Sequence, residues 1–196
     1  MGKVIGVTGS FATGKTTVAN MFLELGLKKI DADEIAHIIF KEDSNIKKKI
    51  LNILGKSILS NNIIDRKKIA NIIFYDKKKL EEYCDLLHPV IIKNIKEKIK
   101  QLFMFDVVVD APLLIEAGLF KDMDVVIVVE AFLEQQIIRG KKKGFSESLI
   151  KQIIKNQMSL SEKKDFADYI IDNSKNNFLS LKKGVIKVWE TLKNKS

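Results

Sequence analysis

The sequence predicts an α/β protein built around a parallel β-sheet, and two observations support this fold class. Short apolar runs, most of them nearly continuous in Val and Ile, are bounded by polar or turn residues, as in strands buried on both faces of a parallel sheet. Between them lie longer stretches in which apolar residues recur at helical spacing. This alternation of strand and helix favours right-handed crossovers within one sheet. The expected strands are residues 3–8, 27–30, 106–109, 124–129 and 169–171, and the clearest helices are residues 16–25, 80–103 and 133–143.

Two interruptions of this alternation predict inserts within a single domain of residues 1–196. The gap between the second and third strands is too long for a simple crossover, so we expect a helical insert at about residues 34–105. Within it, the His88-Pro89 pair predicts the start of a further helix. A second, lysine-rich insert at about residues 139–157 predicts a small helical lid.

The composition is that of a folded protein, because 46% of the 196 residues are hydrophobic and 30% are charged. A chain of this length buries roughly 70% of its unfolded surface, which excludes disorder as the main state. No uncharged apolar stretch approaches the roughly 18 residues needed to cross a bilayer, so we expect no membrane span. A single cysteine, Cys84, allows no internal disulfide and favours a cytoplasmic location. Cys84 and the two histidines are too few ligands for a standard structural zinc site.

Basic residues exceed acidic ones by 34 − 25 = 9, which raises the question of a nucleic-acid partner. The charge is dispersed, because lysines occur in short runs at 47–49, 77–79 and 141–143, and only Arg66 and Arg139 are arginines. Such runs usually line solvated helix faces rather than form a stripe for nucleic acid. The sequence therefore predicts neither a nucleic-acid partner nor a membrane partner.

The strongest motif is a phosphate-binding loop of the pattern GxxxxGK[ST] at residues 9–16, GSFATGKT. Gly9 and Gly14 give the backbone freedom that turns N–H groups toward phosphates. Lys15 supplies a positive charge, Thr16 offers a hydroxyl to Mg²⁺, and the following helix presents its positive dipole end. A chance glycine-rich turn is the alternative, but the apolar strand before the loop and the apolar-periodic helix after it favour a phosphate site.

Carboxylates follow the second and third expected strands, where open α/β sheets bind their ligands. Asp31 and Asp33 lie two residues apart in what we expect to be an extended segment, so their side chains share one side. One would organise Mg²⁺ through water and the other would accept the proton of an attacking hydroxyl, whereas the alternative is that either residue caps the next helix. Asp110 ends the third strand and is either a further Mg²⁺ ligand or an ordinary turn residue before Pro112.

Two further residues have one functional and one structural interpretation. Arg139 stands at the start of the lysine-rich insert, and a planar guanidinium stabilises charge on a transferring phosphoryl group. A surface ion pair is the structural alternative for Arg139. His88 is a lone histidine, and most lone histidines are structural.

The order of these motifs resembles that of the dephospho-coenzyme A kinase family along nearly the whole chain. The resembling segments are VTGSFATGKTTVA at 7–19, IDADEIAH at 30–37, IDR at 64–66, HPVI at 88–91, VVVDAPLLIEAG at 107–118, DVVIVV at 124–129, residues 136–139, Gln157 and ADYIIDN at 167–173. The resemblance implies a three-layer P-loop kinase fold with the five-stranded order 2-3-1-4-5, an acceptor-binding helical insert and a small helical lid. It also implies Mg²⁺-dependent transfer of the γ-phosphoryl group of ATP to the ribose 3′-hydroxyl of dephospho-coenzyme A, the final step of coenzyme A synthesis.

The resemblance further implies roles for individual residues. Asp33 would orient or deprotonate the hydroxyl, while Lys15 and Arg139 act on the transferring group. The implied ATP-binding residues are Gly9, Phe11, Ala12, Thr13, Gly14, Lys15, Thr16, Thr17 and Asn173. The implied acceptor-binding residues are Asp33, His88, Leu113 and Glu116, and the implied metal site comprises Thr16, Asp31 and Asp110.

The chain departs from the family pattern in two places. In the phosphate-binding loop, residues 10–12, Ser-Phe-Ala, stand where the family has a glycine-rich sequence. In the lid, Lys142 or Lys143 and Ile153 stand near expected arginines. Lysine still neutralises phosphate as a point charge, whereas isoleucine does not.

The sequence leaves two other functions open. One is a P-loop kinase that acts on a nucleoside monophosphate or another small hydroxyl acceptor, against which the segments at 30–33 and 88–89 argue. The other is a basic nucleic-acid-binding NTPase switch, which predicts salt-sensitive binding to DNA or RNA and no soluble phosphoryl acceptor.

Overall fold

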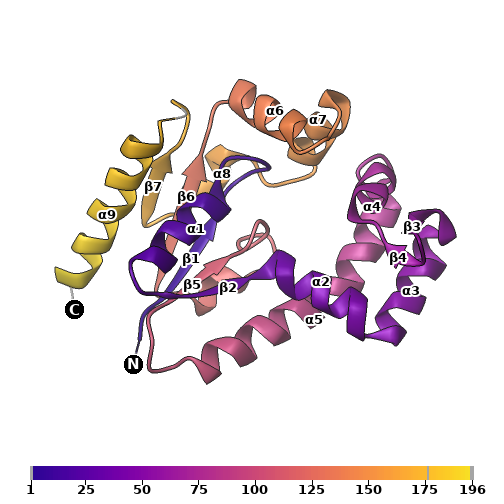
Figure 1. Ribbon diagram of the computed structural model, residues 1–196, viewed down its shortest axis with the longest axis horizontal. Helices are drawn as coiled ribbons and strands as arrows, with labels where there is room; N and C mark the ends of the chain where they lie inside the picture. Colours follow the sequence, from indigo (N-terminus) through magenta and orange to yellow (C-terminus); the bar gives the residue numbers. More distant parts are fainter. Residues whose placement is uncertain (1, 176, 195–196) are drawn as a thin grey trace.

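The computed structural model describes residues 2–175 and 177–194, and a five-stranded parallel sheet lies at its centre (Figure 1). The strands are β1 (Val4–Thr8), β2 (Lys28–Asp31), β5 (Val107–Asp110), β6 (Val125–Glu130) and β7 (Tyr169–Asp172). Their order in the sheet is β2-β5-β1-β6-β7. Numbered along the chain without a small separate hairpin, this is the predicted order 2-3-1-4-5. Each strand end lies within one residue of its expected position.

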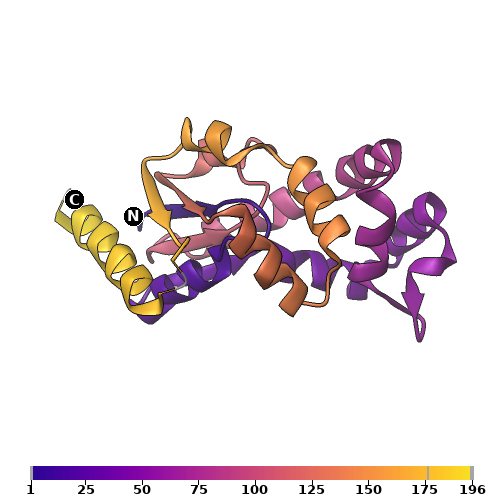
Figure 2. The ribbon, with the colours of Figure 1, turned by 90° about the horizontal axis from the view of Figure 1, so that it is seen from above.

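Helices on both faces of the sheet complete three layers (Figures 1 and 2). One face is covered by α1 (Lys15–Glu24) and α9 (Phe178–Asn194), whose Phe22 and Trp189 rings meet edge to face at 6.4 Å. The other face is covered by α2 (Ala32–Glu42) and α5 (Lys77–Gln101). Successive residues of a strand point to opposite faces, so Ile5 belongs to the first core and its neighbour Val4 to the second. This two-sided burial is why the three central strands, β1, β5 and β6, are almost continuously apolar, whereas the edge strands β2 and β7 are partly exposed and carry polar residues.

The chain between β2 and β5 forms the expected helical insert. Its elements are α2, α3 (Ser44–Leu54), a 3₁₀ turn (Lys56–Ile58), β3 (Leu59–Ser60), β4 (Ile63–Ile64), α4 (Arg66–Ile73) and α5. The β3–β4 hairpin was not predicted. Its turn residues Asn61 and Asn62 have φ values of 51° and 61°, in the left-handed region that Asn tolerates better than most residues. The Asn-Asn pair therefore encodes a hairpin turn.

Each α-helix of the insert begins at an aspartate whose side chain accepts hydrogen bonds from the first-turn backbone N–H groups. These N-cap residues are Asp31, Asp43, Asp65 and Asp76. Each such cap contributes about 1 kcal/mol to helix stability. The repeated caps fix where the insert helices start.

The predicted helix start at His88 is wrong, because α5 runs unbroken from Lys77 to Gln101 with Pro89 inside it. Proline lacks an N–H group, so one intrahelical hydrogen bond is lost. Burial of Leu87 and Ile95, which are 2% and 1% exposed in the insert core, offsets this loss on either side of the proline. Tertiary packing therefore overrides the local signal.

The expected lid consists of the end of α6 (Leu133–Lys142) and of α7 (Glu147–Lys155), and it is followed by α8 (Leu160–Lys164). Ser146 caps α7, and Ser159 forms a reciprocal capping box with Glu162 at the start of α8. The lid meets the insert where the Tyr75 and Ser148 hydroxyls lie 2.9 Å apart. In the described part of the chain, no helix combines the length and apolar character of a membrane span.

Candidate active site

The phosphate-binding loop joins β1 to α1 at the carboxyl edge of the sheet. Gly14 has a φ of 105°, and Gly9 has a φ of 154°, where a Cβ would lie 2.3 Å from the Val129 carbonyl oxygen. Both positions therefore require glycine. Ala12 adopts a left-handed φ of 57°, which costs an L-residue about 1–2 kcal/mol. The loop thus keeps its tight path where alanine replaces the family's glycine.

The Thr13 carbonyl of this loop accepts hydrogen bonds from two other elements. Asn173, which follows β7, donates through Nδ2 at 2.8 Å, and Arg139, in the last turn of α6, donates through Nη1 at 3.1 Å. Arg139 also donates through Nη2 to the Asn173 carbonyl at 2.8 Å. These bonds connect the loop to the lid and to the segment after β7, and they place Arg139 beside the loop.

Gln157, between α7 and α8, holds the opposite side of the same loop. Its Oε1 accepts from the Phe11 backbone N–H at 2.9 Å and from the Ser10 hydroxyl at 3.2 Å. A glycine at position 10 would lack that hydroxyl. Ser10 is only 2% exposed, so its hydrogen bond to Gln157 satisfies a buried hydroxyl group.

Lys15 lies within electrostatic reach of two of the carboxylates that follow strands, Asp110 and Asp33. Burial lowers the pKa of Lys15, and the charges of Asp110 and Asp33 oppose this shift. Lys143 and Lys163 act on Lys15 in the same direction as burial. Lys143 is thus a lid lysine whose charge acts at the phosphate-binding loop.

Asp110 ends β5 opposite Asp31 of β2 in the strand pairing and is 3% exposed. Burial raises the pKa of Asp110, while a hydrogen bond from the Thr16 hydroxyl and the charge of Lys15 lower it. The carboxylate, the hydroxyl and the ammonium group therefore form one cluster. Asp31 and Asp110 are therefore neighbours at the carboxyl edge of the sheet.

The expectation that Asp31 and Asp33 point the same way in an extended segment is wrong. Asp31 ends β2 and caps α2, accepting from the N–H groups of Asp33 and Glu34 at 2.9 and 3.2 Å. Its other carboxylate oxygen pairs with Lys29 at 3.0 Å. Asp33 is already helical, and its Oδ1 accepts from Arg66 Nη2 of α4 at 2.5 Å. The cap turns the chain into a helix before Asp33, which ends the two-residue alternation.

The three remaining acceptor candidates come from α5 and from the loop after β5. His88 is half-buried; burial lowers its pKa, and the charges of Asp85 and Glu116 oppose the shift. Leu113 is half-buried in the loop after β5. Glu116 pairs with Lys163 of α8 at 2.9 Å. The structure therefore brings Glu116 within electrostatic reach of His88.

The structure adds functional candidates that the sequence did not single out for a role. Arg66 stood out only for its rarity and as part of the resembling segment at 64–66, yet its guanidinium holds Asp33. Gln157 was noticed only as part of a resembling segment. Lys163 carried no signal, since one lysine among many on a polar stretch looks like any solvated residue.

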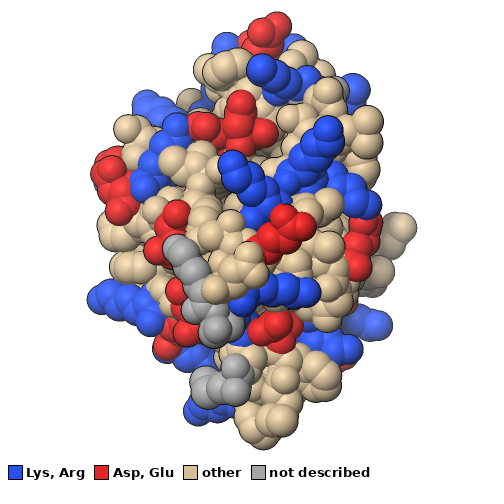
Figure 3. Space-filling view, turned by 90° about the vertical axis from the view of Figure 1, so that its left-hand side faces the viewer, with Lys and Arg blue, Asp and Glu red and all other residues tan. Residues whose placement is uncertain are grey.

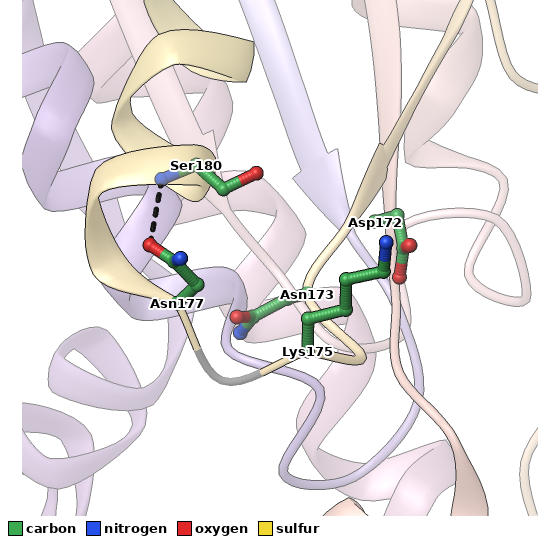
Figure 4. A pocket seen from close by; sticks show the side chains of 5 residues that line it. All are labelled: Asp172, Asn173, Lys175, Asn177 and Ser180. Atoms are coloured by element: carbon green, nitrogen blue, oxygen red, sulfur yellow. Dashed lines mark hydrogen bonds between the residues drawn. The ribbon is translucent and has the colours of Figure 1, made fainter.

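A pocket of about 130 Å³ lies at the β7–α9 connection, beside the phosphate-binding loop (Figure 4). Its described lining residues are Asp172, Asn173, Lys175, Asn177 and Ser180. Asn177 Oδ1 accepts from the Ser180 N–H at 3.0 Å, which caps the first turn of α9. Asn173, predicted to bind ATP, links this pocket to Thr13 of the loop. The position suits the base of a nucleotide whose phosphates occupy the loop.

A parallel sheet of this order, a phosphate-binding loop after its central strand, an insert after β2 and a helical lid together define a P-loop kinase. Residues 3–178 match the family model described as Dephospho-CoA kinase. The chain is 38% identical to the dephospho-CoA kinase of Aquifex aeolicus over 97% of both chains. It therefore belongs to the dephospho-CoA kinase family, whose members phosphorylate dephospho-coenzyme A with ATP in the final step of coenzyme A synthesis.

Solved structures agree with this assignment. The chain shares 30% identity and a TM-score of 0.69 with dephospho-CoA kinase from Campylobacter jejuni, over 98% of both chains. A shikimate kinase from Acinetobacter baumannii, at 15% identity and a TM-score of 0.58, shares the fold alone; 100% of this chain and 96% of that one are covered. The enzyme is thus an ATP-dependent kinase, and the comparisons favour dephospho-coenzyme A as acceptor over a nucleoside monophosphate.

Proposed function

We propose that the phosphoryl transfer to the ribose 3′-hydroxyl takes place at the carboxyl edge of β1, β2 and β5, with Asp33 as the residue that orients the hydroxyl and accepts its proton. The observation that carries this proposal is the position of Asp33 in the first turn of α2, directly after the carboxyl end of β2 and within electrostatic reach of Lys15 of the phosphate-binding loop. Asp33 is exposed at the start of α2, so an acceptor can reach it. No other carboxylate at this edge combines exposure with proximity to Lys15 in the described residues.

Positioning and charge neutralisation carry most of the rate in this proposal. The transition state of phosphoryl transfer is loose, so the acceptor hydroxyl needs little activation. Lys15 and the N-terminus of α1 stabilise negative charge on the phosphates. Arg139 holds the loop through Thr13 and lies close to Gly14, from which its guanidinium acts on the transferring group.

Arg66 prepares Asp33 for its role. Its Nη2 holds Oδ1 of Asp33, and its Nη1 donates to the Asp33 carbonyl at 3.3 Å. The guanidinium therefore fixes the carboxylate against the first turn of α2 and leaves Oδ2 for a hydroxyl. Because Arg66 belongs to α4, the insert that we propose to bind the acceptor also positions the proton acceptor.

We propose Mg²⁺ as the metal that accompanies ATP, and the residues present fit it. The Thr16 hydroxyl and the Asp110 carboxylate are hard oxygen donors in mutual hydrogen bond, close to Lys15. Asp31 is engaged by its cap and by Lys29, so we expect its contribution to be indirect. In the described chain, no group of three or more His, Cys, Asp or Glu residues is arranged around a metal position. That suits Mg²⁺, which usually keeps several waters and binds substrate phosphates. When bound, Mg²⁺ neutralises charge on the β- and γ-phosphates.

The domain layout, the cellular location and the absence of nucleic-acid partners belong to the same proposal. The insert (about residues 34–105) holds the acceptor, and the lid (about residues 139–157) closes over ATP within one domain. On the face seen from the α9 side, lysines and arginines are interspersed with acidic residues rather than gathered in one patch (Figure 3). On this face, therefore, the charges do not form a stripe for nucleic acid. The single, free Cys84 supports a cytoplasmic location in this proposal.

The test is acceptor-dependent ADP release with Mg²⁺ and ATP, with the product identified by mass spectrometry. We expect Asp33→Asn to lower kcat at least 100-fold while the dissociation constant of ATP changes less than threefold. Glu34→Gln, on the same helical turn and also exposed, is the matched control and keeps wild-type turnover. Wild-type turnover in Asp33→Asn would remove the role of Asp33. Turnover of the wild-type enzyme with nucleoside monophosphates but not with dephospho-coenzyme A would contradict the acceptor.

A further inference from the structure

Lys163 is fully buried, at 0% exposure, and no other lysine or arginine in residues 2–175 and 177–194 is buried to this degree. Its ammonium group donates to the Pro112 carbonyl at 2.8 Å and contacts both carboxylate oxygens of Glu116, at 2.9 and 3.1 Å. A buried charge is costly unless it is paired and hydrogen-bonded. Every partner of Lys163 that these distances define lies in one loop, the loop after β5.

That loop is part of the acceptor side of the site. It follows Asp110, the last residue of β5, and contains Leu113 and Glu116. The Thr8 hydroxyl at the end of β1 donates to the same Pro112 carbonyl at 3.2 Å. Lys163 therefore fixes the loop at the point where it leaves the sheet edge.

Lys163 is also the last residue of a short segment that contacts the phosphate-binding loop. We name residues 157–163 the return segment, because it leads the chain from the lid back to the sheet. At its start, Gln157 accepts from the Phe11 N–H of the phosphate-binding loop at 2.9 Å. Next to it, the Met158 N–H donates to Glu116 Oε1 at 3.2 Å. The return segment therefore contacts the phosphate-binding loop through its first residue, Gln157. It contacts Glu116 through its second residue, Met158, and through its last residue, Lys163.

The charges of Lys163 and Glu116 act on residues of both the phosphate side and the acceptor side of the site. Lys163 is among the charges that lower the pKa of Lys15, while the charge of Glu116 acts on His88 in the opposite direction to burial. The ion pair is therefore within electrostatic reach of both the phosphate-side lysine and the acceptor-side histidine. A surface salt bridge far from the site would change the pKa of neither Lys15 nor His88.

We propose that Lys163 is a positioning residue that holds Glu116 and the 112–116 loop in the geometry that receives the acceptor, and that the return segment thereby joins the acceptor site to the ATP loop. Both oxygens of Glu116 are engaged by Lys163 and Met158, so Glu116 acts by placing the loop. The Pro112 carbonyl is likewise engaged by Lys163 and Thr8, so the half-buried Leu113 is the residue of the loop that is left to meet the acceptor in this proposal. This inference rests on the proposed acceptor site and names what keeps it in place.

The test is a double-mutant cycle between Lys163→Met and Glu116→Gln, read as kcat, KM for dephospho-coenzyme A, the dissociation constant of ATP and Tm. Each single variant leaves a charge that has lost its partner, and the double variant removes both charges. We expect each single change to lower kcat/KM for dephospho-coenzyme A at least tenfold while ATP binding changes less than threefold. The double variant recovers part of that loss. Lys164→Met, the neighbouring residue whose partner is Glu130 at the surface, is the control and keeps wild-type kcat/KM.

Three outcomes would overturn the proposal: additive losses in the cycle, equal losses for ATP and acceptor, or a lowered Tm with unchanged kcat/KM. If Lys163→Met does not fold, Lys163→Arg and Glu116→Gln carry the test, since the arginine keeps the charge and we expect it to retain more acceptor kcat/KM than Glu116→Gln. The wild-type enzyme separates this result from the proposed function. Absence of acceptor-dependent turnover in the wild type contradicts the proposed function, whereas wild-type turnover that survives both single changes contradicts only the role of Lys163.

Discussion

Gly14→Ala tests the geometry of the phosphate-binding loop, and Gly26→Ala is its matched control. Gly14 has a φ of 105°, and a Cβ there would lie 2.2 Å from Nδ2 of Asn173. Gly26, after α1, has a φ of 101°, and a Cβ there would meet nothing within 4 Å. The two substitutions therefore impose the same backbone strain, but only Gly14→Ala forces the Asn173 amide away from the Thr13 carbonyl.

The magnitudes follow from these contacts. A left-handed alanine costs about 1–2 kcal/mol, and the stiffer unfolded chain returns about 0.4–1 kcal/mol, so Gly26→Ala destabilises by about 0–1.6 kcal/mol. At about 2–4 °C per kcal/mol for a chain of this size, Tm falls by at most about 6 °C. Gly14→Ala adds the loss of a buried hydrogen bond, about 1–3 kcal/mol, and so lowers Tm by about 2 °C or more beyond the effect of Gly26→Ala.

The assay is thermal unfolding with and without ATP, together with calorimetric titration of ATP. We expect the dissociation constant of ATP to rise at least about tenfold in Gly14→Ala, which is about 1.4 kcal/mol, because the loop N–H groups no longer face the phosphates. Gly26→Ala keeps wild-type affinity. Equal effects of the two substitutions on Tm and on ATP binding would refute the reasoning, since the contact with Asn173 would then carry no energy.

Two further predictions concern charged and titratable groups. Lys15→Ala should lose several kcal/mol of transition-state stabilisation, seen as a fall of at least about 100-fold in kcat/KM; an unchanged kcat/KM would show that the loop binds no transferring phosphate. Burial lowers the pKa of His88 below its ordinary 6.5, so its contribution to stability is fully present above pH 6.5 and is lost as the pH falls through the lower folded-state pKa. His88→Gln should therefore flatten the dependence of Tm on pH between about 5 and 7.5, and a dependence equal to that of the wild type would contradict the assignment.

The fold was predictable because its three central strands are buried on both faces. A strand with cores on two sides must be apolar at consecutive positions, as Val107–Asp110 is until its last residue, and the short length and valine content of such a run favour a strand over a helix. The phosphate-binding loop was predictable for a similar reason. Its glycines are required by backbone geometry, so the requirement appears directly in the sequence.

The parts that the sequence missed depend on contacts between distant residues. Pro89 marks a local break, but burial of Leu87 and Ile95 keeps α5 continuous. The pairing of Arg66 with Asp33 joins residues 33 positions apart, and that of Lys163 with Glu116 joins residues 47 positions apart. No spacing rule within one element reports such pairs, because they exist only once the insert and the return segment have folded onto the sheet.

The two departures from the family pattern, one in the phosphate-binding loop and one in the lid, are related because their side chains pack together. Phe11 of the ATP loop and Ile153 of the lid belong to one small apolar cluster, in which Phe11 also meets the Phe145 ring edge to face at 5.3 Å. Ala70 and Phe74 bring the insert into the same cluster. Ile153 is 3% exposed, so it serves as packing where a charged residue was expected. Burying these side chains joins the loop, the lid and the insert by the hydrophobic effect, which salt does not screen. We propose that the neutralisation of phosphate in this lid is left to Arg139, which donates to the loop at Thr13, and to Lys143, whose charge acts on Lys15.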